Sequence, residues 1–211
     1  MKTLFKDLLA QDRCLACHGL KERQEFLCEE CNSKIVYLDG IRKIDGVDCY
    51  FSVLYRGSVK KLIYDYKFKG RQKIRDYFAS LMAEKIAEKN LTDYSVVIVP
   101  SSKKTLKQRG FDHIGEIARA LSAKTGMEYI EDCLIKTRET KKQHELSRNE
   151  RAKNLAGAFG LVKDISGKKI LVIDDIVTTG HTLREIGKLI HDQCLDYKFL
   201  AVTSSRIDTP I

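Results

Sequence analysis

One segment of this 211-residue chain reads Ile170-Leu171-Val172-Ile173-Asp174-Asp175-Ile176-Val177-Thr178-Thr179-Gly180-His181-Thr182. Its four leading apolar residues predict a strand buried on both faces, and two acids stand where that strand should end. A short loop rich in threonine follows, and apolar residues at helical spacing then predict a helix. A strand, a loop and a helix N-terminus in this order are typical of a phosphate site in a parallel α/β sheet, because the first N–H groups of the helix are unpaired and its dipole is positive there.

The two acids, Asp174 and Asp175, need a separate explanation, because carboxylates beside a phosphate loop repel a phosphate. They are understandable if the ligand also carries hydroxyl groups, or a divalent metal that offsets the charge. The 2′- and 3′-hydroxyls of a ribose with a 5′-phosphate meet both requirements. The alternative is an ordinary buried strand followed by a turn.

This order of apolar strand, two acids and Thr-Thr-Gly-x-Thr resembles the signature of the type I phosphoribosyltransferases. The resemblance implies an α/β fold with a parallel sheet and flanking helices. It also implies that Asp174 and Asp175 hold the ribose hydroxyls of phosphoribosyl pyrophosphate (PRPP) and its Mg²⁺. The 5-phosphate would lie in the loop made of Ile176, Val177, Thr178, Thr179, Gly180, His181 and Thr182.

Composition sets wider bounds. The formal net charge is +9, which favours polyanionic partners, although a lysine-rich proteome would give the same balance. No apolar run approaches the length that crosses a membrane. The first residues, 1–7, lack the apolar core and cleavage site of a secretory signal, so we expect a cytoplasmic protein.

Four of the seven cysteines form two C-x-x-C pairs, Cys14 with Cys17 and Cys28 with Cys31. Two such pairs close together can offer four thiolates to one tetrahedral zinc ion, and a closed four-cysteine site is structural. A redox dithiol is the alternative for the first pair. We therefore predict a zinc module over residues 1–40 and a phosphoribosyltransferase-like domain over 41–211, with 34–50 as a connection.

A basic stretch with an embedded aromatic residue lies within 41–80, a segment that we interpret as the hood of the domain. Its members are Lys67, Phe68, Lys69 and Arg71. Such a stretch could contact a nucleic-acid backbone and stack a base. A solvated turn with one buried phenylalanine is the alternative.

A second buried strand is predicted over 94–99, and polar residues follow it at the ligand side of such sheets. Ser101, Ser102, Lys103 and Lys104 could hold a pyrophosphate there, together with Arg109. A surface role for the two lysines is the alternative. Residues 134–159 are highly charged, and within them Thr140, Lys141, Lys142 and Gln143 could belong to a mobile basic lid over the site. A disordered surface loop would have the same composition.

Taken together, these motifs resemble the ComF family of phosphoribosyltransferase-like proteins linked to DNA uptake in naturally competent bacteria. The resemblance rests on the four cysteines, Tyr64 to Gly70, Gln108-Arg109-Gly110-Phe111 and the loop after Asp175. The chain departs from the family at Ser101-Ser102-Lys103 and at Asp112-His113, on the pyrophosphate side. The family implies binding of PRPP, Mg²⁺ and single-stranded DNA, beside a helicase-like DNA-uptake ATPase and peripheral to the membrane machinery.

Three functions remain open at this stage. The chain could be a Mg²⁺-dependent phosphoribosyltransferase with an unidentified acceptor, since carboxylates and cations for a leaving pyrophosphate are present. It could instead be a binding module in which PRPP is sensed while the zinc module and basic surfaces hold DNA or a partner. A nucleobase salvage enzyme leaves the cysteine module unexplained.

Overall fold

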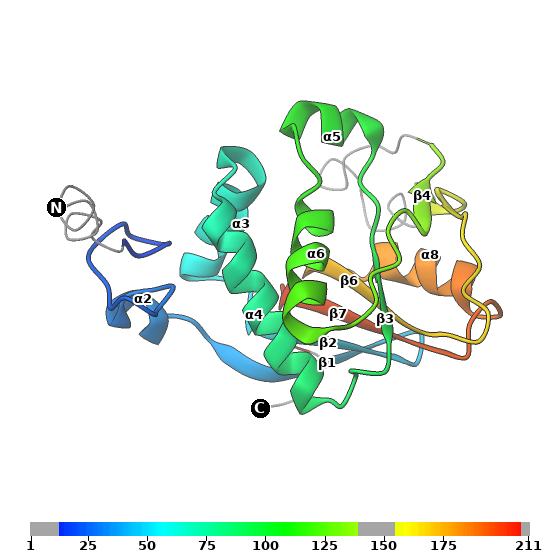
Figure 1. Cartoon of the computed structure of the whole chain (residues 1–211), viewed down its shortest axis with the longest axis horizontal. Helices are drawn as coiled ribbons and strands as arrows, with labels where there is room; N and C mark the ends of the chain where they lie inside the picture. The colour runs from blue at the N-terminus through cyan, green and yellow to red at the C-terminus, as the bar shows by residue number, and fades with distance from the viewer. Residues whose placement is uncertain (1–12, 139–154, 208–211) are drawn as a thin grey trace, which may run out of the picture.

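The computed structural model describes residues 13–138 and 155–207. At its centre is a five-stranded sheet in the order β1-β2-β7-β6-β3 (Figure 1). Four neighbouring strands are parallel and β1 is antiparallel to β2 at the edge. The strands are β1 (Tyr37–Ile44), β2 (Val47–Leu54), β3 (Ser95–Ile98), β6 (Lys169–Val177) and β7 (Asp196–Ser204). The predicted α/β fold with a parallel sheet is confirmed.

Helices cover both faces of this sheet. The helices α3 (Gly57–Lys69), α4 (Gln72–Glu88) and α6 (His113–Thr125) pack on one face, and α8 (His181–Ile190) packs on the other. Side chains alternate along β6, so Leu171 and Ile173 join the first core while Ile170 and Val172 join the second. Three further short elements are α5 (Lys103–Arg109), β4 (Leu134–Lys136) and β5 (Phe159–Leu161), of which β4 pairs antiparallel with β5.

The central strand β6 is longer than the sequence predicts. We expected it to end at Asp174 and Asp175, but it continues to Val177 because β7 pairs with it as far as Ser204. The two acids are therefore strand residues. Consecutive strand residues point to opposite faces of a sheet, so the two carboxylates enter different surroundings.

The connection predicted over residues 34–50 is wrong, because this segment forms β1 and the start of β2. Residue 40, where we placed the end of the zinc module, lies inside β1. Gly40 lies against the ring of Phe51, and a Cβ at this position would lie 2.3 Å from that ring. A glycine here lets the edge strand approach β2 closely.

The cysteine segment, which includes the short helix α2 (Glu29–Ser33), packs on the same core as α3 and α4. Leu15, Leu27 and Ile35 are buried in that core, and the rings of Phe26 and Tyr77 lie 5.3 Å apart. The module is therefore attached to the main domain by apolar packing.

Candidate functional site

A cavity of about 540 Å³ lies at the end of β6. It is lined by Lys67 of α3 and by residues 174–183, which run from the acid pair through the loop into α8. All nine predicted ribose and 5-phosphate residues therefore border one cavity. The structure brings together what the signature predicts.

The loop turns into α8 at Gly180. This residue has a positive φ of 78°, a conformation that glycine adopts without strain, and it is the N-cap of the helix. The helix makes its first bond from the Arg184 N–H to the Gly180 carbonyl, at 2.9 Å. A Cβ on Gly180 would lie 3.1 Å from Ile44, so β1 supports the loop from behind. The first N–H groups of a helix, together with its positive dipole end, are a place where an anion can bind.

Arg42 of β1 is a site residue that the sequence reasoning missed. Its side chain is only 2% exposed, although arginine is rarely buried. Its Nη1 donates to the Thr178 carbonyl at 2.8 Å and to Ser204 Oγ at 3.2 Å. A buried guanidinium therefore holds the loop at Thr178 and adds positive charge beneath it.

The two acids have opposite electrostatic roles. Asp175 is 3% exposed, forms an ion pair with Lys67 and lies with Oδ1 3.8 Å from Nε2 of His113. Burial alone would raise the pKa of Asp175, but Lys67 and His113 outweigh it and hold that pKa well below its usual range. Asp175 is thus a fixed negative charge.

Asp174 accepts a hydrogen bond from the Asp175 N–H at 2.8 Å. Burial and the neighbouring charge of Asp175 raise the pKa of Asp174 well above its usual value. Paired carboxyl groups with separated pKa values can divide the roles of proton holder and fixed charge.

A second cation, Arg109, is connected to Asp175 by way of His113. Arg109, at the end of α5, contacts Nδ1 of His113 at the start of α6, and its guanidinium lies 5.8 Å from the ring centre of Phe68. Burial lowers the pKa of His113, so the neutral imidazole dominates at neutral pH. With Nδ1 accepting from Arg109, we assign the proton to Nε2, which faces Asp175.

The residues that we predicted to hold the pyrophosphate lie apart from the cavity lining. None of Ser101, Ser102, Lys103, Lys104 and Arg109 is among the residues that line the cavity. Ser102 Oγ instead caps α5 by accepting from the Thr105 N–H at 3.2 Å, and the two lysines lie exposed in the first turn of that helix. Arg109 is linked to the acid pair through His113.

The four residues that we predicted to contact nucleic acid lie in different surroundings. Lys67 points into the cavity, whereas Lys69 and Arg71 pair with the buried Asp65 at 2.8 and 3.4 Å. Phe68 is 66% exposed, with its ring 5.0 Å from that of Tyr64, which is also exposed. The predicted lid residues Thr140, Lys141, Lys142 and Gln143 lie outside the described residues.

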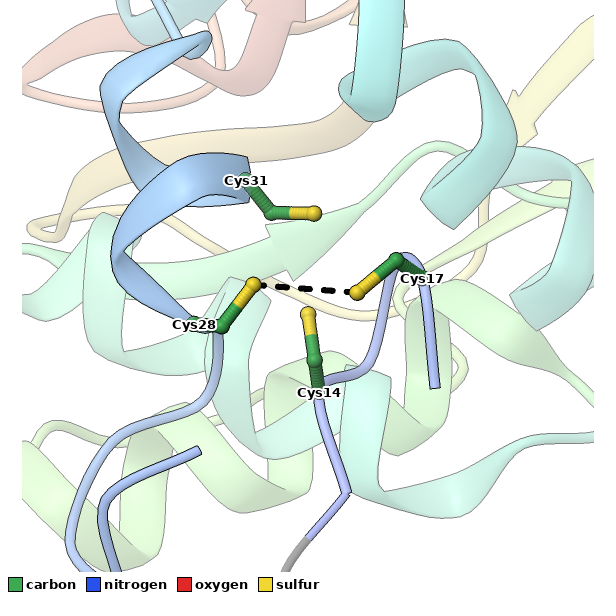
Figure 2. Close-up of side chains that lie close together, drawn as sticks. All are labelled: Cys14, Cys17, Cys28 and Cys31. Atoms are coloured by element: carbon green, nitrogen blue, oxygen red, sulfur yellow. Dashed lines mark hydrogen bonds between the residues drawn. The ribbon is translucent and has the colours of Figure 1, made fainter. Parts of the chain in front are cut away.

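The four cysteines of the N-terminal segment converge. Their sulfur atoms all lie within 4.8 Å of one another, and Figure 2 shows them pointing toward a common centre. The Sγ atoms of Cys17 and Cys28 are 3.6 Å apart. Ligands at about 2.3 Å from a tetrahedral ion give about this spacing. Backbone N–H groups of Ala16 and Gly19 donate to Cys14 and Cys17 at 3.4 and 3.3 Å.

The four thiols of the cluster differ in their electrostatics, because burial and the neighbouring cysteines raise the pKa of Cys31. Although burial works to raise it, the backbone donors around Cys14 lower the pKa of its thiol to about 6. These four residues could therefore hold a metal ion, and their all-sulfur set fits zinc.

The chain is similar to known protein families and to named relatives. The family model described as "Phosphoribosyl transferase domain" matches residues 72–195, more than half of the chain. "Competence protein ComFC" of Streptococcus pneumoniae is 28% identical over 184 residues, which cover 87% of this chain and 76% of that protein. "DNA utilization protein YhgH" of Escherichia coli is 30% identical over 142 residues, 64% of this chain and 62% of the relative, so the match spans less than two thirds of that relative.

Among solved structures, the adenine phosphoribosyltransferase of Thermoanaerobacter pseudethanolicus is similar with a TM-score of 0.40 and 15% identity, over 83% of this chain and 98% of that one. Within residues 13–138 and 155–207, no helix combines the length and apolar character needed to cross a bilayer. The family-model match and the competence-protein relatives show that the chain belongs to the phosphoribosyl transferase domain family and, within it, to the ComF family.

Proposed function

We propose that this protein binds PRPP with Mg²⁺ and acts, in the cytoplasm, in the handling of single-stranded DNA during DNA uptake. One observation carries the proposal: an acid pair and a helix N-terminal loop border the same cavity. The loop suits the 5-phosphate and the acids suit ribose hydroxyls. The names of the ComFC and YhgH relatives support the link to DNA.

The charges around the cavity support an anionic ligand despite the two acids. Lys67 neutralises Asp175 from the α3 side, and Arg42 lies beneath the loop. The raised pKa of Asp174 further limits the negative charge that a phosphate meets. The site can therefore accept a polyanion that also carries hydroxyl groups.

The acid pair also fits a Mg²⁺ ion that arrives with PRPP. Magnesium favours one or two carboxylates together with substrate phosphates, and Asp174 is the acid not engaged by Lys67. The ion would neutralise charge on the pyrophosphate. The chain's own part is to orient the ribose through Asp174 and to keep Asp175 ionised and fixed.

For the DNA we propose a contact at Phe68 and Tyr64. Their exposed rings form a tilted pair on α3, with an interplanar angle of 44°. Lys69 Nζ lies 5.6 Å from the centre of the Tyr64 ring, and the Arg109 guanidinium lies near Phe68. Exposed aromatic rings flanked by cations suit unpaired bases, because stacking does not depend on base identity. A helicase-like ATPase of the uptake machinery is the protein partner that we propose.

For the cysteine cluster we propose zinc in a structural role. The four sulfur atoms fill a tetrahedral site and leave no position for a substrate. The segment that carries the cluster packs on α3 and α4 through the shared core, and this packing supports a role as a scaffold of the main domain.

A second candidate is a PRPP sensor that performs no transfer. The observation that favours it is the position of Lys67, which belongs to a helix rather than to the sheet and meets the acid pair directly. A ligand that changes this ion pair would also act on α3, where the aromatic pair lies. An active transferase would release pyrophosphate when a nucleobase, nucleotide or DNA is added, whereas a sensor would bind PRPP without turnover.

The proposal is tested by calorimetric titration of PRPP and Mg²⁺ into the wild type and into the Asp174→Asn/Asp175→Asn double variant. We expect binding to the wild type and a loss of at least tenfold in affinity in the double variant, with Asp93→Asn as a matched control. Asp93 is an exposed acid paired with Lys169. Equal affinity in all three proteins would contradict the ribose assignment.

DNA binding has its own test. Fluorescence anisotropy with an oligothymidine strand should show affinity that falls steeply with salt, because phosphate contacts release counterions. Phe68→Ala should weaken binding by about 1–3 kcal/mol, the usual contribution of one base stacked on an aromatic ring. A Val162→Ala variant, which also shortens an exposed apolar side chain, is the control. If Phe68→Ala and Val162→Ala bind equally well, the aromatic contact is wrong.

A further inference from the structure

Asp65 lies in a place that neither the cavity nor the cysteine cluster explains. It belongs to α3 and is only 1% exposed, yet three cations surround its carboxylate. Lys69 lies 2.8 Å away, Lys61 3.1 Å and Arg71 3.4 Å. A buried carboxylate with this many partners is ionised, and the pKa of Asp65 is lowered because these cations outweigh its burial.

Two of those cations also hold the cysteine module. Lys61 Nζ donates to the carbonyl of Ala16 at 2.5 Å, and Arg71 Nη1 donates to the carbonyl of Leu15 at 2.7 Å. Leu15 and Ala16 are the two residues between Cys14 and Cys17, so both carbonyls belong to the turn that presents the first two sulfur atoms. Asp65 thus orients the donors that fix the shape of a metal-binding turn.

The opposite face of the same helix reaches the cavity. Successive helix residues are rotated by about 100°, so a residue two positions after Asp65 points roughly the other way. That residue is Lys67, which pairs with Asp175. Between the two faces, Tyr66 is buried and its hydroxyl donates to the His113 carbonyl at 2.7 Å. Figure 1 shows α3 between the N-terminal cysteine segment and α6.

We propose that Asp65 is a positioning residue that couples the four-cysteine module to the acidic cavity through α3. When the module holds its metal, the turn at Leu15 and Ala16 is ordered and its carbonyls fix Lys61 and Arg71 around Asp65. The helix is then held in the position that brings Lys67 to Asp175. Loss of the metal loosens the turn, frees the helix on that face and weakens the placement of Lys67.

This inference rests on the proposed function only for its link to PRPP. The coupling itself is between the cysteine module and α3, and it can be measured without any ligand. Coupling between two binding sites is reciprocal. PRPP bound at the cavity should therefore raise the affinity for the metal by the same factor by which the metal raises the affinity for PRPP.

The first arm of the test measures metal release from zinc-loaded full-length protein in excess chelator. Asp65→Asn should release zinc about 5- to 10-fold faster than the wild type, at the lower end of typical coupling between sites. Lys61→Met removes the contact to Ala16 but leaves Asp65 with two cations, so it tests the same link if Asp65→Asn fails to fold. Asp93→Asn, distant from the module, should release zinc at the wild-type rate.

The second arm measures hydrogen exchange of backbone amides with and without zinc. Removal of the metal should raise exchange across Gly57–Lys69 by about tenfold, with α8 as the internal reference that does not change. Equal zinc release in wild type, Asp65→Asn and Lys61→Met would overturn the proposal. So would unchanged exchange in α3 after zinc removal.

The PRPP arm separates this inference from the proposed function. In a wild type that binds PRPP, the ligand should slow zinc release, and zinc removal should lower the affinity for PRPP. If neither ligand affects the other, the coupling is overturned. A zinc-loaded wild type that does not bind PRPP would refute the proposed function, while the release and exchange measurements would still decide the role of Asp65.

Discussion

Removal of the Lys67 ammonium group gives the sharpest prediction about the cavity. In Lys67→Met the apolar stem is retained, but Asp175 is left buried without its main partner. Breaking a buried ion pair by removing one member typically lowers the free energy of unfolding by 3–5 kcal/mol. The side chain of Lys67 is 18% exposed and His113 remains beside Asp175, so we expect the lower end, about 3 kcal/mol. For a chain of this size that lowers Tm by about 6–12 °C.

The effect should depend on pH with a defined sign. Because folding depresses the pKa of Asp175, the stabilisation from its pairing is fully present above the unfolded-state pKa of about 4 and is lost as pH falls toward the folded value. Without Lys67, burial raises that pKa, so the carboxyl protonates more readily. The difference in unfolding free energy between wild type and Lys67→Met should therefore be largest at pH 7 and shrink between pH 5 and pH 3.

Urea unfolding followed by circular dichroism at several pH values measures this difference. The double variant Lys67→Met/Asp175→Asn removes both charges and should recover about 2 kcal/mol relative to Lys67→Met, as expected for two residues in direct contact. Lys60→Met, an exposed lysine on the same helix whose ammonium lies 5.6 Å from the ring centre of Tyr55 and not at a carboxylate, is the control for helix propensity. The ion pair would be refuted if the loss of unfolding free energy in Lys67→Met did not depend on pH. It would also be refuted if the effects of Lys67→Met and Asp175→Asn were additive in the double variant.

Two further predictions concern other parts of the site. Arg42→Met should leave the Thr178 carbonyl without its buried donor and weaken PRPP binding in calorimetry by about 1–3 kcal/mol. Arg119→Met on the outer face of α6 should have no effect, and equal affinities of the two variants would contradict a role for Arg42 in the loop. Cys14→Ser should abolish stoichiometric zinc, as measured by elemental analysis, and should lower Tm. Cys194→Ser, which lies outside the cluster, should keep the metal. A native protein without zinc would rule out the zinc module.

The parts of the site that the sequence predicts are those built by contiguous residues. The acids, the loop and Gly180 lie within one strand–loop–helix unit, and local patterns describe such units well. The same holds for the cysteines, whose spacing brings their sulfur atoms together. Alternation along β6 also implies that Asp174 and Asp175 differ in surroundings, a signal available in the sequence once the strand is known to continue past them.

The parts that the sequence does not predict depend on distant pairing. Arg42 lies 136 residues from Thr178, and no local pattern marks an arginine within a strand as a buried donor. Strand β1 was missed because its buried positions are interrupted by polar and glycine residues, and its register is set by β2. Ser102 has the residue type of a phosphate ligand, but the same hydroxyl is an N-cap once α5 follows it.

Arg42 and Lys67 share a further property: both precede residue 72, where the match to the phosphoribosyl transferase domain begins. The acids and the loop fall inside the matched region, but Arg42 comes from the β1–β2 hairpin and Lys67 from α3, both of which precede it. A chain cut back to the matched region would keep its signature and lose its charge balance, leaving two carboxylates to face a phosphate alone. In this chain the matched domain and the proposed binding site therefore have different boundaries, and a swap of one without the other should yield a recognisable but incompetent protein.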